Sequence, residues 1–259
     1  MLRLSDLRLR AIAAGTRASA RAWRWLFDWR GSNVLHFVDR KRSSDERVCV
    51  EDRAASSRYG GPTRRTKRTK YPPVDLKSRD VVIVLHQTGF ERTARRWKET
   101  AHRVTCHRLV DPTGRAFMVH PITTRLVAAN RLDRAPWHAI SVEVAGNFER
   151  EDGSGKYWKP EKFGRGRASD AQIHGARLEV ARIIREVQEA GASVAMIAPH
   201  RISGQNAAGK PNRQACPGSR VWLEVGEWCA DLFGLATPPE GWECGGAPIP
   251  ESWRPSPKK

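Results

Sequence analysis

The 259-residue chain lacks several features that would place it in well-known protein classes. It has no stretch approaching the roughly 20 consecutive apolar residues that a membrane-spanning helix needs, which excludes an integral membrane protein built on such helices. Its first ten residues alternate leucine with charged residues and contain no uninterrupted apolar core. We therefore expect no signal peptide and synthesis in the cytoplasm. The sequence also contains no internal repeat.

Cysteine is scarce, with five residues at irregular positions and no CxxC pair. This number is too small and too irregular for a disulfide scaffold, and an odd count leaves at least one thiol unpaired. The pattern favours synthesis in a reducing compartment or a metal-bound thiolate.

Acidic residues are also few, because 28 Asp and Glu stand against 46 Lys and Arg, which gives a net charge of +18. The excess is concentrated in residues 1–70, which hold 18 basic and 7 acidic residues. Within them, residues 2–29 are expected to form an arginine-rich helix and residues 53–70 a flexible linker. The simplest interpretation is a solvated extension. A more specific interpretation is that the extension anchors the protein to anionic lipid or to an anionic wall polymer. Nucleic acid is not expected as a partner, since no nucleic-acid-binding fold accompanies the charge.

From residue 80 onward the pattern is typical of an alternating α/β domain. Apolar, β-branched runs predict strands, and three- and four-residue apolar spacing predicts helices. The expected strands are 80–85, 104–110, 116–119, 139–145 and 194–198, and the expected helices are 91–102, 170–190 and 220–233. We expect three parts, namely a basic extension and linker at 1–79, the α/β domain at 80–235, and a Pro/Gly-rich tail at 236–259 that wraps the surface.

Three residues stand where metal ligands are often found. His86 closes the apolar run DVVIVLH, His200 closes VAMIAPH, and Cys216 lies in the loop ACPG before the last helix. Two imidazoles and a thiolate would fill three of the four tetrahedral positions of a zinc ion and leave one for water. Taken singly, each is more often a structural residue, so spacing alone does not establish a site.

Five motifs in order change that assessment: IVLHQTG, TCHRLVDPTGRAF, HAISVEVAG, APHRISG and ACPGSRVW. Together they resemble the zinc-dependent N-acetylmuramoyl-L-alanine amidases of type 2, a fold family shared with peptidoglycan recognition proteins. The resemblance covers approximately residues 80–233 and implies an α/β fold with a central mixed β-sheet flanked by helices.

The resemblance implies a role for several residues. His86, His200 and Cys216 fall on the three positions that bind Zn²⁺ in the family, and Glu143 falls on the strand carboxylate that serves as general base. His107 falls on a substrate-binding strand position. A carboxylate near a zinc-activated water can take its proton and deliver it to the departing amine.

Two features concern the substrate. Many active relatives carry Lys or Thr two residues before the third ligand, where it stabilises the oxyanion. Here that position is Gln214, which supplies a hydrogen-bond donor without charge, and Arg213 stands beside it as a substrate-binding candidate. Trp137 is expected either to line a sugar or peptide groove or to pack in the core.

These observations lead to one principal hypothesis and one alternative. The principal hypothesis is a monomeric zinc amidase that cleaves the bond between N-acetylmuramic acid and L-alanine in peptidoglycan and acts on the bacterial cell wall, as a phage endolysin does. The alternative is a non-catalytic peptidoglycan-binding protein of the same fold. A basic nucleic-acid-binding protein would account for the charge, but not for the His/His/Cys/Glu set.

Overall fold

The computed structural model describes residues 34–37, 48–51, 73–89, 105–126, 128–151, 154–206, 208–242 and 244–255. The chain divides into two units, Met1–Ala55 and Ser56–Lys259, and the second contains the predicted α/β region. No helix in the described part of the chain is long and apolar enough to span a membrane.

Two short strands make up the described part of the first unit. Strand β1 (Val34–Phe37) pairs antiparallel with β2 (Val48–Glu51), so that Val34 lies opposite Glu51. The sequence analysis predicts no strand here, because runs of four residues do not stand out in a basic background. The helices expected at 2–29 and 91–102, and the linker expected at 53–70, lie outside the described residues.

The second unit is built on a five-stranded mixed sheet in the order β5-β4-β6-β3-β7. Its strands are β3 (Asp80–Gln87), β4 (Arg108–Val110), β5 (Ala116–Met118), β6 (Trp137–Val144) and β7 (Val194–Pro199). Strand β3 runs parallel to β6 and β7, β4 runs parallel to β6, and only β5 is antiparallel to its neighbour. The predicted fold class is confirmed. The strand expected at 104–110 is shorter than predicted, because β4 covers only Arg108–Val110.

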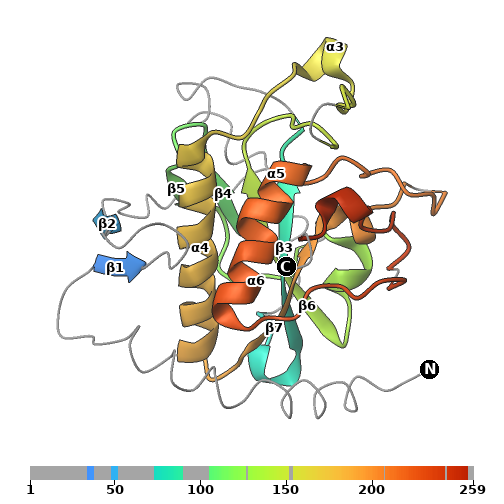
Figure 1. Ribbon diagram of the computed structural model, residues 1–259. Helices are drawn as coiled ribbons and strands as arrows, with labels where there is room; N and C mark the ends of the chain where they lie inside the picture. The colour runs from blue at the N-terminus through green and yellow to red at the C-terminus, as the bar shows by residue number, and fades with distance from the viewer. Residues whose placement is uncertain are drawn as a thin grey trace. The chain divides into compact units, whose positions relative to one another are not determined.

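Helix α4 (Asp170–Glu189) begins with the predicted capping box, in which Ser169 accepts a hydrogen bond from the backbone of Gln172 and the Gln172 side chain accepts one from the backbone of Ser169. Its apolar face contributes Val180 and Ile183 to the main core. The capping box fixes the start of the helix because it satisfies backbone N–H groups that have no partner within the helix. Figure 1 shows α4 and α6 lying side by side over one face of the sheet.

The last helical segment runs continuously from Ser219 to Phe233, close to the predicted 220–233. It consists of α5 (Ser219–Val221), a π-helical section (Trp222–Glu227) and α6 (Trp228–Phe233). The fully buried Trp222 lies in the π-helical section and belongs to the main core. Short helices complete the unit, namely η2 (Leu76–Ser78), η4 (Asn130–Asp133), α3 (Pro160–Phe163), η5 (His200–Ile202) and η7 (Glu251–Trp253).

The C-terminal tail differs from the sequence expectation, which placed residues 236–259 on the surface. Trp253 is fully buried, and Ile249 and Cys244 belong to the same core as the sheet. Ala236 also forms a parallel bridge with Met196 of β7. The spacing of apolar residues in a Pro/Gly-rich segment follows neither strand nor helix periodicity, so burial of this kind gives no pattern in the sequence.

Candidate metal centre

Three neighbouring strands end at the same edge of the sheet. His86 of β3 pairs with Glu143 of β6, and Leu85 of β3 pairs with Pro199 of β7, so that His200 follows directly at the same level. Paired residues on parallel strands project to the same face of the sheet, about 4.8 Å apart. The register therefore places Glu143 and His86 side by side on one face, with His200 beside them.

The Cys216 loop brings a third potential metal ligand to this edge. The ligand atoms of His86, His200 and Cys216 all lie within 4.8 Å of one another, and all three residues are buried. Cys216 Sγ is 3.6 Å from His200 Nδ1, and the two imidazole rings have centroids 4.2 Å apart. The sequence expectation that these three residues share a site matches where the structure places them.

The donor set and its spacing fit a zinc ion. With Zn–N near 2.05 Å and Zn–S near 2.3 Å, two ligands of a tetrahedral ion lie about 3.6 Å apart, which is the separation found between Cys216 Sγ and His200 Nδ1. The Nε2 atoms of His86 and His200 are buried and have no hydrogen-bond partner among the described residues. An imidazole binds one ion through one nitrogen, so the distance to Cys216 assigns Nδ1 as the potential ligand atom of His200.

Burial also sets the protonation of the two imidazoles. It lowers the pKa of His200 to about 3, assisted by the positive charge of Arg213, and it lowers the pKa of His86 well below its usual value. Both rings are therefore neutral near pH 7, which is the form that binds a metal ion. Burial raises the pKa of the Cys216 thiol to about 12, so metal binding must displace its proton.

Glu143 lies beside the three potential ligands. Its Oε2 atom is buried and has no hydrogen-bond partner among the described residues. Burial raises the pKa of its carboxyl to about 8, and the positive charge of Arg213 opposes that rise. A carboxyl group with a pKa near neutrality can both accept and donate a proton, which suits general acid–base chemistry.

Gln87 is a site residue that the sequence analysis missed. Its backbone N–H donates to Cys216 Sγ at 3.3 Å, and its side-chain Nε2 donates to the carbonyl of Ala215 at 2.7 Å. Its Oε1 accepts from the backbone N–H of Phe148, which follows β6. One buried amide therefore ties the Cys216 loop to the loop after β6. The only available signal was its position next to His86, which is too general to assign a role.

Arg213 and Gln214 precede Cys216 in its loop, and both are exposed. The Arg213 guanidinium lies 5.3 Å from the ring centroid of Trp158, and its charge reaches His86, His200, Glu143 and Cys216. Gln214 Oε1 accepts a hydrogen bond from Arg150 Nη1 at 3.0 Å, which leaves its amide N–H groups as the donors. Arg213 therefore supplies positive charge at this edge, together with Arg201, whose charge also acts on Cys216.

The structure does not support the substrate-binding roles expected for His107 and Trp137. His107 is fully buried, its Nδ1 accepts from the backbone of Ser141, and its Nε2 donates to the carbonyl of Thr124. Both ring nitrogens are therefore occupied within the protein. Trp137 begins β6, six residues before Glu143, which is about 20 Å along a strand. It packs edge-on against Trp242, with ring centroids 5.9 Å apart.

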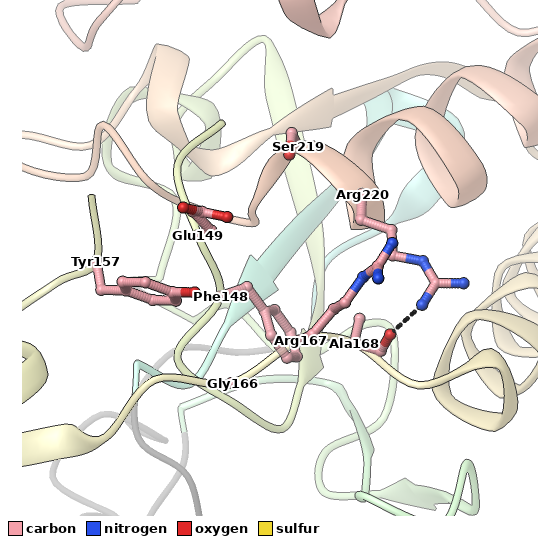
Figure 2. Close-up of a pocket in the computed structure, with 8 residues that line it drawn as sticks. All are labelled: Phe148, Glu149, Tyr157, Gly166, Arg167, Ala168, Ser219 and Arg220. Atoms are coloured by element: carbon pink, nitrogen blue, oxygen red, sulfur yellow. Dashed lines mark hydrogen bonds between the residues drawn. The ribbon is translucent and has the colours of Figure 1, made fainter. Parts of the chain in front are cut away.

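A separate pocket of about 240 Å³ lies next to the start of the last helical segment (Figure 2). Its lining residues are Phe148, Glu149, Tyr157, Gly166, Arg167, Ala168, Ser219 and Arg220. Arg220 closes one side through hydrogen bonds to the carbonyl of Ala168 and to Asp170. None of the residues expected to bind metal or substrate lines this pocket, so it is distinct from the metal-ligand cluster.

The described residues thus form an α/β fold with a buried His/His/Cys cluster at the carboxyl ends of its parallel strands. The family model for N-acetylmuramoyl-L-alanine amidase matches residues 78–219, more than half of the chain, and the chain belongs to this family of type 2 amidases. The matched region contains His86, Glu143, His200 and Cys216. A comparison with curated proteins finds no match.

Several solved structures are similar to this chain at low sequence identity. The N-acetylmuramoyl-L-alanine amidase LysC from Clostridium intestinale is 11% identical, with a TM-score of 0.41 over 64% of this chain and 92% of its own. The Ph2119 endolysin from a Thermus scotoductus bacteriophage is 17% identical, with a TM-score of 0.33 over 64% and 88%. The Drosophila peptidoglycan recognition protein SD is 11% identical, with a TM-score of 0.36 over 64% and 90%. Family membership rests on the match of the family model.

Proposed function

We propose that this protein is a zinc-dependent amidase that hydrolyses the bond between N-acetylmuramic acid and L-alanine in peptidoglycan. The observation that carries the proposal is the convergence of His86, His200 and Cys216 within 4.8 Å, with Glu143 on the adjacent strand. A protein that only binds peptidoglycan has no need of a three-ligand site with a free carboxyl group beside it. Membership in the amidase family supports the same reaction.

In this proposal His86, His200 and Cys216 hold the zinc ion. When bound, zinc activates a water molecule as a nucleophile and polarises the scissile carbonyl group. Glu143 accepts the proton of the attacking water on Oε2 and delivers it to the nitrogen of the departing L-alanine. Its Oε2 atom has no other hydrogen-bond partner among the described residues, which leaves it available for this transfer.

Arg213 and Gln214 supply the polar groups that face the substrate. The Arg213 guanidinium is placed to attract the negative charge that develops on the carbonyl oxygen or a carboxylate of the stem peptide. Gln214 contributes an amide N–H donor, while its oxygen is held by Arg150. Charged donors stabilise an oxyanion more strongly than neutral ones, so Arg213 is expected to contribute more than Gln214.

The test combines metal analysis of the purified full chain with a wall-turbidity assay, with and without a chelator. We expect about one zinc ion per chain and lysis that stops when the metal is removed and resumes when zinc is restored. Protein that contains no zinc and lyses no wall material would contradict the proposal. Zinc-free protein that still binds wall fragments would instead favour the non-catalytic binding protein.

We further propose the biological setting that fits this reaction. The protein would be made in the cytoplasm and act on the cell wall as a monomer in the manner of an endolysin, with 1–79 as a basic extension. The extension would attract the protein to anionic wall polymers or lipid.

Deleting 1–70 should then leave activity on a small soluble muropeptide unchanged, but reduce lysis of whole walls at low salt. Equal lysis by both proteins at low salt would refute the anchor.

A further inference from the structure

Residues 244–253 lie against the segment that follows His200. The backbone N–H groups of Cys244 and Gly246 donate to the carbonyl of Ile202, and the N–H of Ala247 donates to the carbonyl of Arg201 at 2.7 Å. A Cβ atom at Gly246 would lie 2.1 Å from the Arg201 carbonyl oxygen. The two backbones therefore approach more closely than a residue with a side chain allows.

Trp253 also contacts the segment that follows His200. Its fully buried ring lies under the guanidinium of Arg201, 4.5 Å from the ring centroid, and its Nε1–H donates to the carbonyl of Arg150 at 2.7 Å. Arg150 in turn donates through Nη1 to Gln214 in the Cys216 loop. One tryptophan thus contacts the neighbour of His200 and is linked to the loop that carries Cys216.

Arg201 joins these contacts to both potential metal ligands. It directly follows His200, and its backbone N–H donates to the carbonyl of Cys216 at 3.1 Å. Its side chain is buried, and its Nε and Nη1 atoms have no hydrogen-bond partner among the described residues. The face of Trp253 is therefore one favourable contact for this buried charge, beside the negative charge of Glu151, since an aromatic face attracts a guanidinium.

We propose that residues 244–253 are a positioning clamp that holds His200 and Cys216 at metal-binding distance. The inference rests on the proposed metal centre. It extends the functional unit past residue 219, where the family match ends, and past residue 235, where the sequence analysis places the end of the domain. Trp253 acts through Arg201 and Arg150, so it is a positioning residue.

The test uses the full chain with zinc and compares Trp253→Ala with Trp242→Ala. Trp242 is a matched control, because it belongs to the same tail but packs on Trp137 at the opposite end of the sheet. Zinc affinity is measured by competition with a chromogenic chelator, and the unfolding midpoint is measured for each variant. Loss of a group that supports metal ligands usually weakens metal binding on the order of 10–100-fold. We expect a loss of this size for Trp253→Ala and wild-type zinc affinity for Trp242→Ala.

Two milder variants keep the test decisive if Trp253→Ala does not fold. Trp253→Phe keeps a ring under Arg201 but loses the hydrogen bond to Arg150, so its zinc affinity should fall less. Gly246→Ala should weaken zinc binding without changing Trp253, because its Cβ atom forces the clamp away from Arg201. Wild-type affinity in both variants would overturn the clamp, as would an equal loss in Trp242→Ala.

A second readout separates the clamp from the proposed function. Hydrogen exchange reports the Arg201 amide, which is bonded to the Cys216 carbonyl, whether or not metal is bound. Faster exchange of this amide in Trp253→Phe and Gly246→Ala, but not in Trp242→Ala, supports the clamp. If the wild type binds no zinc, the metal centre fails, and this exchange result still decides whether 244–253 hold the two residues together. Unchanged exchange in every variant would overturn the clamp itself.

Discussion

A buried ion pair joins β4 to α4 and permits a quantitative prediction about the fold beneath the site. Arg108 Nε donates to Glu179 Oε1 at 2.7 Å, and the two side chains are only 1% and 4% exposed. Arg108 Nη2 donates to both carboxylate oxygens of Glu186, and Nη1 donates to the carbonyls of His107 and His120. All five N–H donors of the guanidinium therefore have acceptors.

Replacing Glu179 by Gln removes the charge of the more buried partner while keeping the shape of its side chain. Removing one partner of a buried pair costs about 3–5 kcal/mol, because the remaining charge stays buried without compensation. Glu186 still faces Arg108, so the lower limit applies, and we expect a loss of about 3 kcal/mol in the free energy of unfolding. The amide N–H₂ group introduced by Glu179→Gln would also face another donor, because Arg182 Nη1 lies 3.2 Å from Glu179 Oε2.

Glu189→Gln provides the matched control on the same helix. Glu189 pairs with Arg185 at 3.5 Å, but its side chain is 67% exposed, and exposed pairs contribute less than about 1 kcal/mol. Urea denaturation measures both variants, and equal slopes against urea concentration show that the unfolded states are comparable. If Glu179→Gln costs no more than Glu189→Gln, the reasoning that burial makes the Arg108 pair important is refuted.

Three predictions concern the site itself. Cys216→Ser should lower zinc affinity and abolish hydrolysis, because a neutral hydroxyl is a far poorer ligand than a thiolate, and full zinc content with full activity would show that Cys216 is not a ligand. Glu143→Gln should reduce turnover on the order of 10²–10⁴-fold with zinc retained, and near-normal turnover would assign the proton transfer to another group. Gln87→Ala should weaken zinc binding by about 10-fold or more, since the Cys216 loop loses its side-chain support, whereas Gln188→Ala, at an exposed position near the end of α4, should bind zinc as the wild type does.

The parts of the fold predicted correctly are those with strong local signals. Strands β3, β6 and β7 are apolar, β-branched runs that are buried on both faces, and α4 begins at a capping box and repeats its apolar residues with helical spacing. The positions of His86 and His200 at the ends of β3 and β7 also made them candidate metal ligands. Cys216 has no local signal of this kind, and its assignment depended on the order of the five motifs.

The errors concern residues whose environment is made by distant parts of the chain. A motif match placed His107 in the substrate site, but it could not show that Ser141 and Thr124 occupy both ring nitrogens. The sequence likewise gave no indication that Trp253 is buried or that Gln87 connects two loops. Each of these depends on tertiary contacts between residues 17 to 129 positions apart along the chain, which no local pattern encodes.

The parallel register has a consequence for how this kind of centre tolerates sequence change. Glu143 and His86 are held on hydrogen-bonded strands and His200 follows the next strand, so strand spacing fixes the intervals along the edge. Cys216 is carried by a loop, and that loop is anchored to the sheet edge by contacts with Gln87 and Arg201. Chain length between residues 202 and 213 can therefore change without moving the ligands, provided that these anchors persist. The cluster thus combines residues whose spacing is set by the sheet with one residue whose position depends on the contacts of a loop.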